Sequence, residues 1–301
     1  TVRDGESWIA FQWLAGNGDG IFLIRADGTG RHQIAAAAGK EQIHPDWSPD
    51  GSKLAFTAFT PGGDRLWQVN ADGTDGRELV ACNLPCNFIE FADWASDGSA
   101  IYYGTGSGGV GDGAPTTFAI DRYDLGSGET STVVESSSAT TVEQPRISPD
   151  GKLLAYTRFR DINDLSAGSA IFVADASGKN ERRLTEWTLF AAFPDWSPDG
   201  RIVFNSRDLA VFQETTEAAN LYSMAADGSD LRQVTHYGPS DTRATQPRWT
   251  PDGLGITYTT VTGSGMGDRR LAYIAADGSG QRSLTPFPTD GTHPSLRPVP
   301  G

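Results

Sequence analysis

His44-Pro-Asp-Trp-Ser-Pro-Asp-Gly51 is the stretch that decides the fold, because the chain repeats it. Phe193-Pro-Asp-Trp-Ser-Pro-Asp-Gly200 is a second copy of the same phrase. Looser copies occupy residues 144–151, 246–253 and 92–98, and a truncated copy, His-Pro-Ser-Leu, occupies residues 293–296. Self-similarity at a regular spacing is the sequence signature of a repeat architecture.

The copies are spread over the whole chain at nearly equal steps. The third position of the phrase is taken by Asp46, Asp93, Arg146, Asp195, Arg248 and Ser295, at steps of 47, 53, 49, 53 and 47 residues. The step from Ser295 through the end of the chain and back to Asp46 is 52 residues. A linear solenoid has no reason to keep its period across its own termini, whereas a closed ring does. The spacing therefore predicts a ring of six units.

Each unit has the pattern of four short strands. The first ends in Asp-Trp-Ser or its equivalent, and the second follows Pro-Asp-Gly, as in Lys53-Leu-Ala-Phe-Thr57. The strands are rich in aromatic and β-branched residues and are bounded by turn residues. In Ser-Pro-Asp-Gly, proline fixes φ and glycine accepts the left-handed conformation, which favours a tight turn. Four-stranded units at this spacing, arranged radially, predict an all-β six-bladed β-propeller of antiparallel blades.

The truncated copy predicts how the ring closes. The last blade takes its inner strand from the C-terminus and its other strands from residues 8–12, 21–24 and 32–34. The whole chain, residues 1–301, is then one propeller domain. Its inner strands are expected near residues 44–48, 91–95, 144–148, 193–197, 246–250 and 293–297.

The repeated phrase, with Leu/Ile-Ala-Phe after the turn, resembles the PD40 repeat of TolB-like propellers, a WD40-like family. The same repeat occurs in the propellers of prolyl-oligopeptidase-like enzymes, tricorn-type proteases and oligogalacturonate lyases. The resemblance covers nearly the whole chain, and it is to the propeller alone, without the N-terminal domain of TolB. It implies the fold and a place in the cell envelope or outside the cell, and it leaves the activity open.

Composition excludes some classes of partner. The net charge of −14 and the pI of about 4.6 argue against nucleic-acid binding, which needs clustered lysine and arginine. No apolar stretch approaches the length of a membrane span. Cys82 and Cys86 are the only cysteines, and we expect a disulfide between them and hence a periplasmic or secreted protein. The alternative is a pair of free thiols in the cytosol.

Antiparallel blades put all tight turns on one face and all long connections on the other. Because function is concentrated on loops that a rigid scaffold holds, we expect a binding site on the long-loop face, at the mouth of the central channel. Its loops carry aromatic residues that can stack on sugars or anchor a peptide, unless they only pack between loops. These are Trp13, Phe59, Phe88, Phe159, Trp187, Phe190, Phe212 and Tyr237, of which Trp187 and Tyr237 are predicted to be reachable by a ligand.

The residue before proline in each inner strand forms a predicted ring at the channel mouth: His44, Ala92, Gln144, Phe193, Gln246 and His293. Ring closure makes Gln246, His293 and His44 neighbours, with His236 in an adjoining loop. Such donors can hold a divalent transition metal, as the His/Gln cluster of oligogalacturonate lyases does. Alternatively, His-Pro is only a common form of the repeat. A second ring lies two residues further along each inner strand. It consists of Asp46, Asp93, Arg146, Asp195, Arg248 and Ser295, and its acids and bases predict ion pairs between neighbouring blades.

Two functions remain after these exclusions. No Gly-x-Ser-x-Gly or His-Glu-x-x-His motif is present, and there are four histidines in all. We therefore favour a non-enzymatic, cofactor-free and monomeric module that binds a protein or peptide. Its predicted ligand-binding residues are His44, Gln144, Phe193, Trp187, His236, Tyr237, Gln246 and His293. The alternative is a metal-dependent enzyme, such as a lyase, that acts on acidic saccharides through His44, His293 and Gln246.

Overall fold

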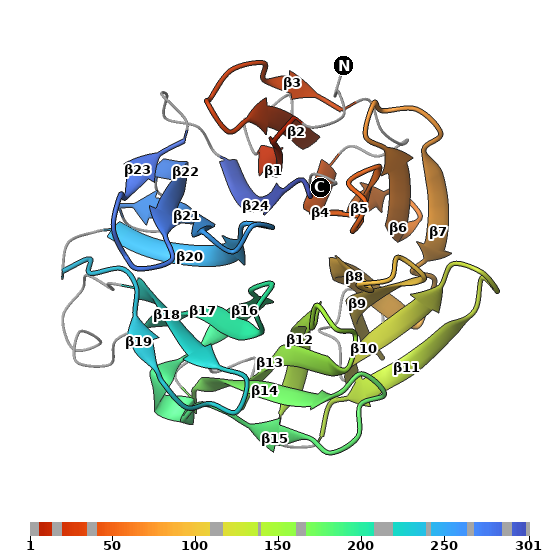
Figure 1. The fold of residues 1–301 in the computed structure, drawn as a ribbon. Coiled ribbons are helices and arrows are strands. Elements are labelled where there is room, and N and C mark those ends of the chain that lie inside the picture. Colours follow the sequence, from red (N-terminus) through yellow and green to blue (C-terminus); the bar gives the residue numbers. More distant parts are fainter. Residues whose placement is uncertain are drawn as a thin grey trace.

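The computed structural model is built of short antiparallel sheets arranged around a central axis (Figure 1). It describes residues 6–13, 20–34, 41–108, 117–137, 140–160, 167–207, 219–238, 242–263, 268–284 and 291–298. A short 3-10 helix, η2 (Trp187–Leu189), lies between two of the sheets in sequence. The described part of the chain contains no helix with the length and hydropathy needed to span a bilayer.

Four sheets have four strands each, and neighbouring strands within them are antiparallel. In sheet order the first is β24 (Gly291–Leu296), β1 (Trp8–Trp13), β2 (Gly20–Arg25) and β3 (His32–Gln33). The second is β4 (Glu41–Trp47), β5 (Lys53–Thr60), β6 (Gly63–Asn70) and β7 (Arg77–Ala81). The third is β8 (Cys86–Trp94), β9 (Ala100–Ser107), β10 (Thr117–Asp124) and β11 (Thr130–Glu135). The fourth is β12 (Thr141–Ile147), β13 (Leu153–Phe159), β14 (Ser169–Asp175) and β15 (Arg182–Arg183).

The remaining strands form one eight-stranded sheet. Its first half is β16 (Ala192–Trp196), β17 (Arg201–Arg207), β18 (Ala219–Ala225) and β19 (Arg232–Gln233). Its second half is β20 (Thr242–Trp249), β21 (Gly255–Thr262), β22 (Asp268–Ala275) and β23 (Arg282–Ser283). The two halves are joined by a parallel bridge between Ala219 and Arg243. The predicted four-stranded antiparallel units are confirmed, but this bridge merges two of the units that the sequence predicts as separate blades.

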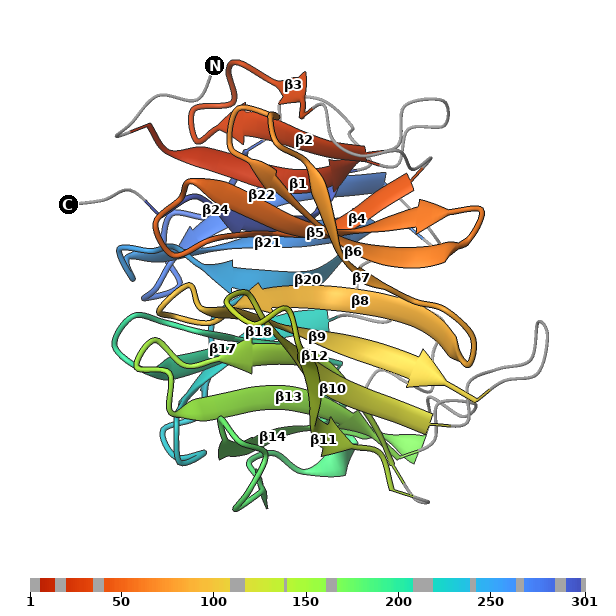
Figure 2. The same ribbon diagram turned by 90° about the vertical axis from the view of Figure 1, so that its right-hand side faces the viewer.

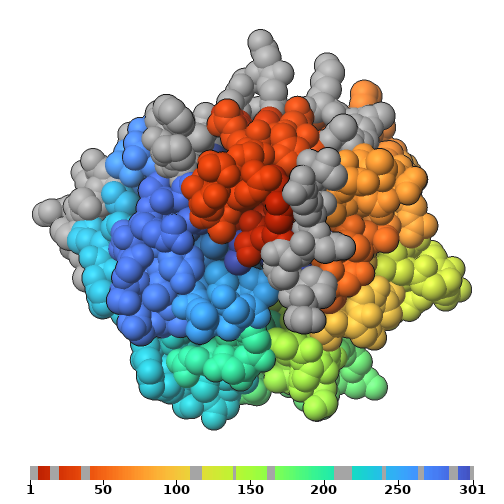
Figure 3. Space-filling model, turned by 45° about the horizontal axis from the view of Figure 1, so that its top comes forward, coloured from red at the N-terminus to blue at the C-terminus, as the bar shows by residue number. Residues whose placement is uncertain are grey.

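The chain termini meet within one sheet, as the truncated repeat predicts. β24 is antiparallel to β1, with Ile9 opposite Leu296 and Ala10 opposite Ser295. The backbone N–H of Arg297 donates to the carbonyl of Trp8 at 2.7 Å. In Figure 3 the N-terminal residues (red) lie between the C-terminal residues (blue) and those of the next sheet (orange).

The repeated phrase forms the inner strand and the turn after it. In the first copy the N–H of Gly51 donates to the carbonyl of Ser48 at 2.8 Å, and Gly51 has a φ of 65°. The Asp50 carboxylate accepts from the hydroxyl of Ser48 at 2.6 Å and the N–H of Ser52 at 3.0 Å. Proline, aspartate and glycine thus each have a role in the turn. Figure 2 shows the consequence edge-on, with β8 running toward one face of the ring and β9 toward the other.

The apolar core lies between adjacent sheets. Trp8 and Leu23 from the first sheet pack in one cluster with Trp47, Phe56 and Val69 from the second. Similar clusters follow at the next sheet boundaries. Both faces of a middle strand are therefore buried, which explains why the middle strands have continuous apolar runs rather than strict alternation.

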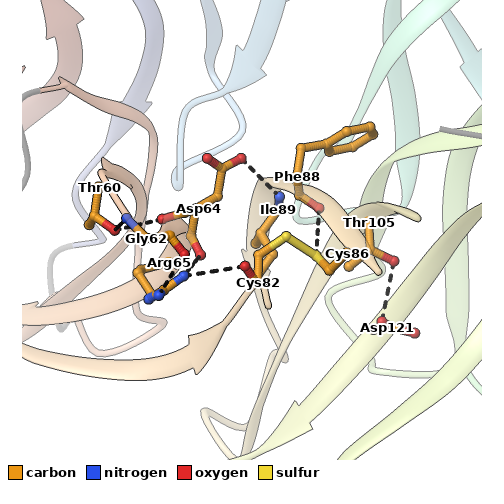
Figure 4. Close-up of a disulfide and its surroundings, with 11 residues drawn as sticks. Thr60, Gly62, Asp64, Arg65, Cys82, Cys86, Phe88, Ile89, Thr105 and Asp121 are labelled. Atoms are coloured by element: carbon orange, nitrogen blue, oxygen red, sulfur yellow. Dashed lines mark hydrogen bonds between the residues drawn. A yellow bond between two sulfur atoms is a disulfide. The ribbon is translucent and has the colours of Figure 1, made fainter. Parts of the chain in front are cut away.

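Cys82 and Cys86 form the predicted disulfide (Figure 4). It links the end of β7 to the start of β8, and so it fastens the connection between two sheets. The N–H of Cys82 also donates to the carbonyl of Asp64 at 2.9 Å, and the Asp64 carboxylate accepts from the N–H of Ile89 at 3.3 Å. These bonds hold β6, β7 and β8 together at the edge of the channel mouth.

Candidate functional site

All inner strands have an irregularity at the same position of the phrase. The register of each strand against its neighbour shifts there, and the residue before the proline position has a φ between 53° and 59°. These residues are His44, Phe91, Gln144, Phe193, Gln246 and His293. A bulge of this kind bends the strand and redirects one side chain, here toward the central axis.

The ring predicted from the sequence is wrong at one position. Phe91, with a φ of 57°, belongs to the ring in place of Ala92. Ala92 occupies the proline position of the phrase, so the residue before it is the one that adopts the left-handed conformation. Counting back from Asp93, the third position of the phrase, leads to Phe91, but without a proline to mark the place the prediction fell one residue too late.

Side chains from one blade hold the bulge of the next. A bulge releases a backbone N–H from the strand ladder, and a buried N–H needs another acceptor. The Gln144 Oε1 accepts from the N–H of Phe193 at 2.8 Å, and the Gln246 Oε1 accepts from the N–H of His293 at 3.2 Å. Likewise, Nδ1 of His44 accepts from the N–H of Phe91 at 3.4 Å. The amide oxygens of both glutamines are thus engaged in holding the ring.

Aromatic rings meet on the axis and close the channel. His44 stacks on Phe91 with 4.1 Å between ring centroids and meets His293 edge-on at 4.2 Å. Phe193 lies across the axis, 5.9 Å from Phe91 and 6.0 Å from His293. Offset and edge-on contacts of this kind are favourable aromatic geometries. The four rings therefore form a floor, which we call the aromatic floor: His44, Phe91, Phe193 and His293.

A layer of charged side chains lies beneath the aromatic floor, toward the Pro-Asp-Gly turns. Arg146 lies 3.5 Å from Asp93 and 3.6 Å from Asp195, and Arg248 lies 3.1 Å from Asp195. The predicted ion pairs between neighbouring blades are present. Arg248 also reaches Asp46, two blades away around the ring, at 3.3 Å. Burial, partly offset by Arg146, raises the pKa of Asp93 to about 7.

A cavity of about 510 Å³ lies above the aromatic floor. His44, Phe193 and His293 line its base. Phe59 and Phe159, the last residues of β5 and β13, line its walls, so it opens on the face opposite the Pro-Asp-Gly turns. The volume is within the usual range of ligand pockets, roughly 300–1,000 Å³.

Several predicted site residues lie elsewhere. Gln144 is only 4% exposed and is absent from the cavity lining, whereas Gln246 lines it. Trp187 packs against Phe172 at 5.5 Å on the outer part of the ring. His236 is exposed outside the cavity.

The remaining aromatic predictions divide in the same way. Tyr237 donates to or accepts from the hydroxyl of Tyr258 at 3.1 Å and lines a separate depression on the outside of β22. Phe190 lines the cavity, Trp13 and Phe88 do not, and Phe212 lies outside the described residues.

Sequence reasoning missed the acidic wall of the cavity. Glu41 and Glu90 line it, and Asp64 and Glu143 act on Glu90 electrostatically. Burial, reinforced by Glu143 and then Asp64, raises the pKa of Glu90 to about 8. Burial also raises the pKa of Glu143 to about 7. Glu90 and Glu143 directly precede the ring residues Phe91 and Gln144, so the corrected register of the phrase can locate them in the sequence. That they lie close together can be known only from the fold.

Glu90→Gln tests this electrostatic environment. Between pH 4.5 and about 8, Glu90 has lost its proton in the unfolded chain but still holds it in the folded protein. The free energy of unfolding therefore falls as the pH rises through this range. Glutamine does not titrate. The melting temperature of the variant should exceed that of the wild type by about 2 °C or more at pH 9 and by little at pH 5. Glu129→Gln, at an exposed turn, should show no such pH dependence. An equal shift at both pH values contradicts the assignment.

Two features of the His/Gln cluster oppose the binding of a metal ion. Burial, together with Arg146 and Arg248, lowers the pKa of His44 to about 3, and burial also lowers that of His293. Both imidazoles are thus neutral, as ligation requires, but two guanidinium groups nearby disfavour a cation. Gln246 Oε1 is already bonded to Thr259 and His293. Within the described ranges, no three His, Cys, Asp or Glu side chains form a group that could hold a metal.

Comparison with known proteins identifies the family. The profile of the TolB beta propeller domain matches residues 4–198 and 119–299, which together span nearly the whole chain. The chain belongs to the TolB β-propeller family. Among solved structures it is similar to TolB from Acinetobacter baumannii, with a TM-score of 0.76 and 17% identity over 98% of this chain and 67% of that one. At that identity the likeness concerns the fold alone.

Proteins that are similar to this chain in sequence match smaller parts of it. The uncharacterized peptidase YuxL of Bacillus subtilis is 30% identical over 128 residues, or 42% of this chain and 18% of YuxL. The Tol-Pal system protein TolB of Xylella fastidiosa is 38% identical over 60 residues, or 20% of this chain and 13% of that protein. The chain thus spans less than a fifth of the length of these two relatives.

Proposed function

We propose that this chain is a single propeller domain, residues 1–301, that binds a protein or peptide through the cavity above the aromatic floor. We count the eight-stranded sheet as two blades, which makes six in all. The proposal rests above all on the cavity, because it is closed beneath and lined by aromatic and charged side chains. Aromatic anchors surrounded by polar groups are typical of peptide-binding pockets.

We further propose a periplasmic or secreted protein that acts as a monomer without a cofactor or catalysis. The disulfide between Cys82 and Cys86 supports an oxidising compartment. The family supports a protein partner, since one relative is named a component of the Tol-Pal system. The poor fit of the His/Gln cluster to a metal favours binding over metal-dependent cleavage of a saccharide.

Ala192→Trp tests where the partner binds. Ala192 lines the cavity and is buried beside Phe193, so a tryptophan there should fill much of the space. Selection from a displayed library of 12-residue peptides should enrich particular sequences on the wild-type protein. The affinity of these peptides for Ala192→Trp should be at least about tenfold lower. Lys152→Trp, on an exposed Pro-Asp-Gly turn, is the matched control and should retain them. Equal enrichment on all three proteins would place the binding site elsewhere.

A further inference from the structure

Acidic side chains line one wall of the cavity and basic side chains line the opposite wall. Glu41 on β4 and Glu90 on β8 line one wall, and Arg243 on β20 and Arg269 on β22 line the other. In Figure 1, β8 and β20 lie on opposite sides of the central axis. A ligand that spans the cavity therefore meets carboxylates at one end and guanidinium groups at the other.

The acidic wall contains more carboxyl groups than the two at the cavity surface. Asp64 is only 6% exposed, and its carboxylate accepts from the N–H of Ile89 at the edge of this wall (Figure 4). Glu143 lies on the next inner strand, close enough to raise the pKa of Glu90. Among the described residues, neither Glu90 nor Glu143 has a salt-bridge partner. A cationic group bound here would favour the ionised form of these carboxyl groups and would pair with the charge that it induces.

A buried acceptor lines the same cavity without a donor. Gln12 is only 5% exposed, and its Oε1 has no hydrogen-bond partner. Gln12 lies opposite Thr292 in the pairing of β1 with β24, between the blades of the acidic and basic walls. The corresponding residues of two other blades, Thr157 and Thr259, donate to ring glutamines. A ligand that donates a hydrogen bond to Gln12 would satisfy this acceptor.

We propose that the cavity binds a short peptide with both ends free, its ammonium group at Glu41 and Glu90 and its carboxylate at Arg243 and Arg269. Gln12 accepts a hydrogen bond from the ammonium group or the first N–H of the peptide. An apolar side chain of the peptide rests on the aromatic floor. Because this floor and the ion pairs beneath it close the channel, a long segment cannot thread through. This inference specifies the ligand class of the site and rests on the proposed function.

A mixture of free tripeptides to pentapeptides, with alanine and phenylalanine at every position, provides the probe. The mixture is divided into portions left free, N-acetylated, C-amidated or blocked at both ends, and each is incubated with the intact protein. Protein-bound peptides are measured by size-exclusion chromatography and mass spectrometry. We expect retention of free peptides and at least tenfold less retention after either end is blocked. The best free peptide then goes to calorimetry.

Two variants assign the ends of the peptide to the walls. Glu90→Gln should weaken the free peptide about tenfold, or about 1.4 kcal/mol, and leave its N-acetylated form unaffected. Arg243→Gln should weaken the free peptide similarly and leave its C-amidated form unaffected. The exposed pair Glu129→Gln and Arg232→Gln are controls of the same chemistry and should change nothing. Melting temperatures near that of the wild type establish that the variants fold.

The outcomes separate this inference from the proposed function. Retention of blocked peptides equal to that of free ones overturns the role of the ends, while peptide binding in the cavity stands if Ala192→Trp abolishes it. Failure to retain any short peptide also overturns the inference, and longer library peptides that still depend on Ala192 then leave the proposed function intact. If the protein retains no short peptide and no library peptide depends on Ala192, both the inference and the proposed function are wrong.

Discussion

Replacing Arg248 with methionine is expected to lower the free energy of unfolding by about 3–5 kcal/mol, because breaking a buried ion-pair network leaves unpaired charges behind. Arg248 lies within 3.3 Å of both Asp46 and Asp195 and 4.0 Å from Asp93. Methionine keeps most of the side-chain volume and removes only the charge and its hydrogen bonds. Urea denaturation followed by tryptophan fluorescence measures the change.

The matched control for Arg248→Met is Arg232→Met. Arg232 also pairs with an aspartate, at 2.8 Å, but its side chain is 68% exposed. Exposed ion pairs contribute about 0–1 kcal/mol, so this variant should remain close to the wild type. Adding Asp195→Asn to Arg248→Met should recover part of the loss, since it removes one of the unpaired charges. Equal stability of the two single variants contradicts a structural role of the charged layer.

The stability defect of Arg248→Met should also depend on pH. Burial already raises the pKa of Asp93 to about 7, and loss of a neighbouring guanidinium raises it further. The folded variant then holds protons that its unfolded chain releases, so its stability falls as the pH rises above the ordinary aspartate range. The defect should be larger at pH 8 than at pH 5.

Ending the chain at residue 290 is expected to abolish the cooperative fold, a loss comparable to the whole stability of an ordinary domain, about 5–15 kcal/mol. The truncation removes β24 and exposes the edge of β1. It also removes the carbonyl of Ser295, which accepts from Nε1 of Trp47 at 3.1 Å, and Arg297, whose Nε donates to the carbonyl of Gly51 at 2.7 Å. Thermal denaturation monitored by near-ultraviolet circular dichroism measures the loss.

A synthetic peptide of residues 291–301 should restore the cooperative transition when it is added to the truncated protein. Strand addition to an exposed edge supplies main-chain hydrogen bonds and fills the same place. A chain that ends at residue 298 keeps β24 and Arg297 and should melt like the wild type. A protein truncated at residue 290 that still melts cooperatively at the wild-type temperature contradicts closure through β24.

The sequence predicts much of this fold because each repeat contains the residues that form its own strand and turn. Ser48-Pro-Asp-Gly51 contains the turn chemistry of the blade, and the truncated His293-Pro-Ser-Leu296 indicates the closure that the pairing of β24 with β1 confirms. The bridge from Ala219 to Arg243 could not be predicted, because it depends on how closely two strands from different units approach. Ala92 in the proline position displaced the predicted ring by one residue.

The candidate site was harder to predict than the fold. The bulge residues follow from the phrase, and four that it singles out, His44, Phe193, Gln246 and His293, line the cavity. The charged walls of the cavity depend on residues at the ends of strands from different blades, and no local pattern connects Glu90 with Arg243. Trp187, His236 and Tyr237 have the chemistry of ligand-binding residues but lie outside the cavity, because the connections that contain them run along the outer part of the ring.

A crystal structure of the protein with its tightest library peptide tests the central claim most directly. We expect peptide density in the cavity, above His44, Phe193 and His293 and between Glu90 and Arg243. Density on the Pro-Asp-Gly turns or along the outer strands, with the cavity empty, would contradict it.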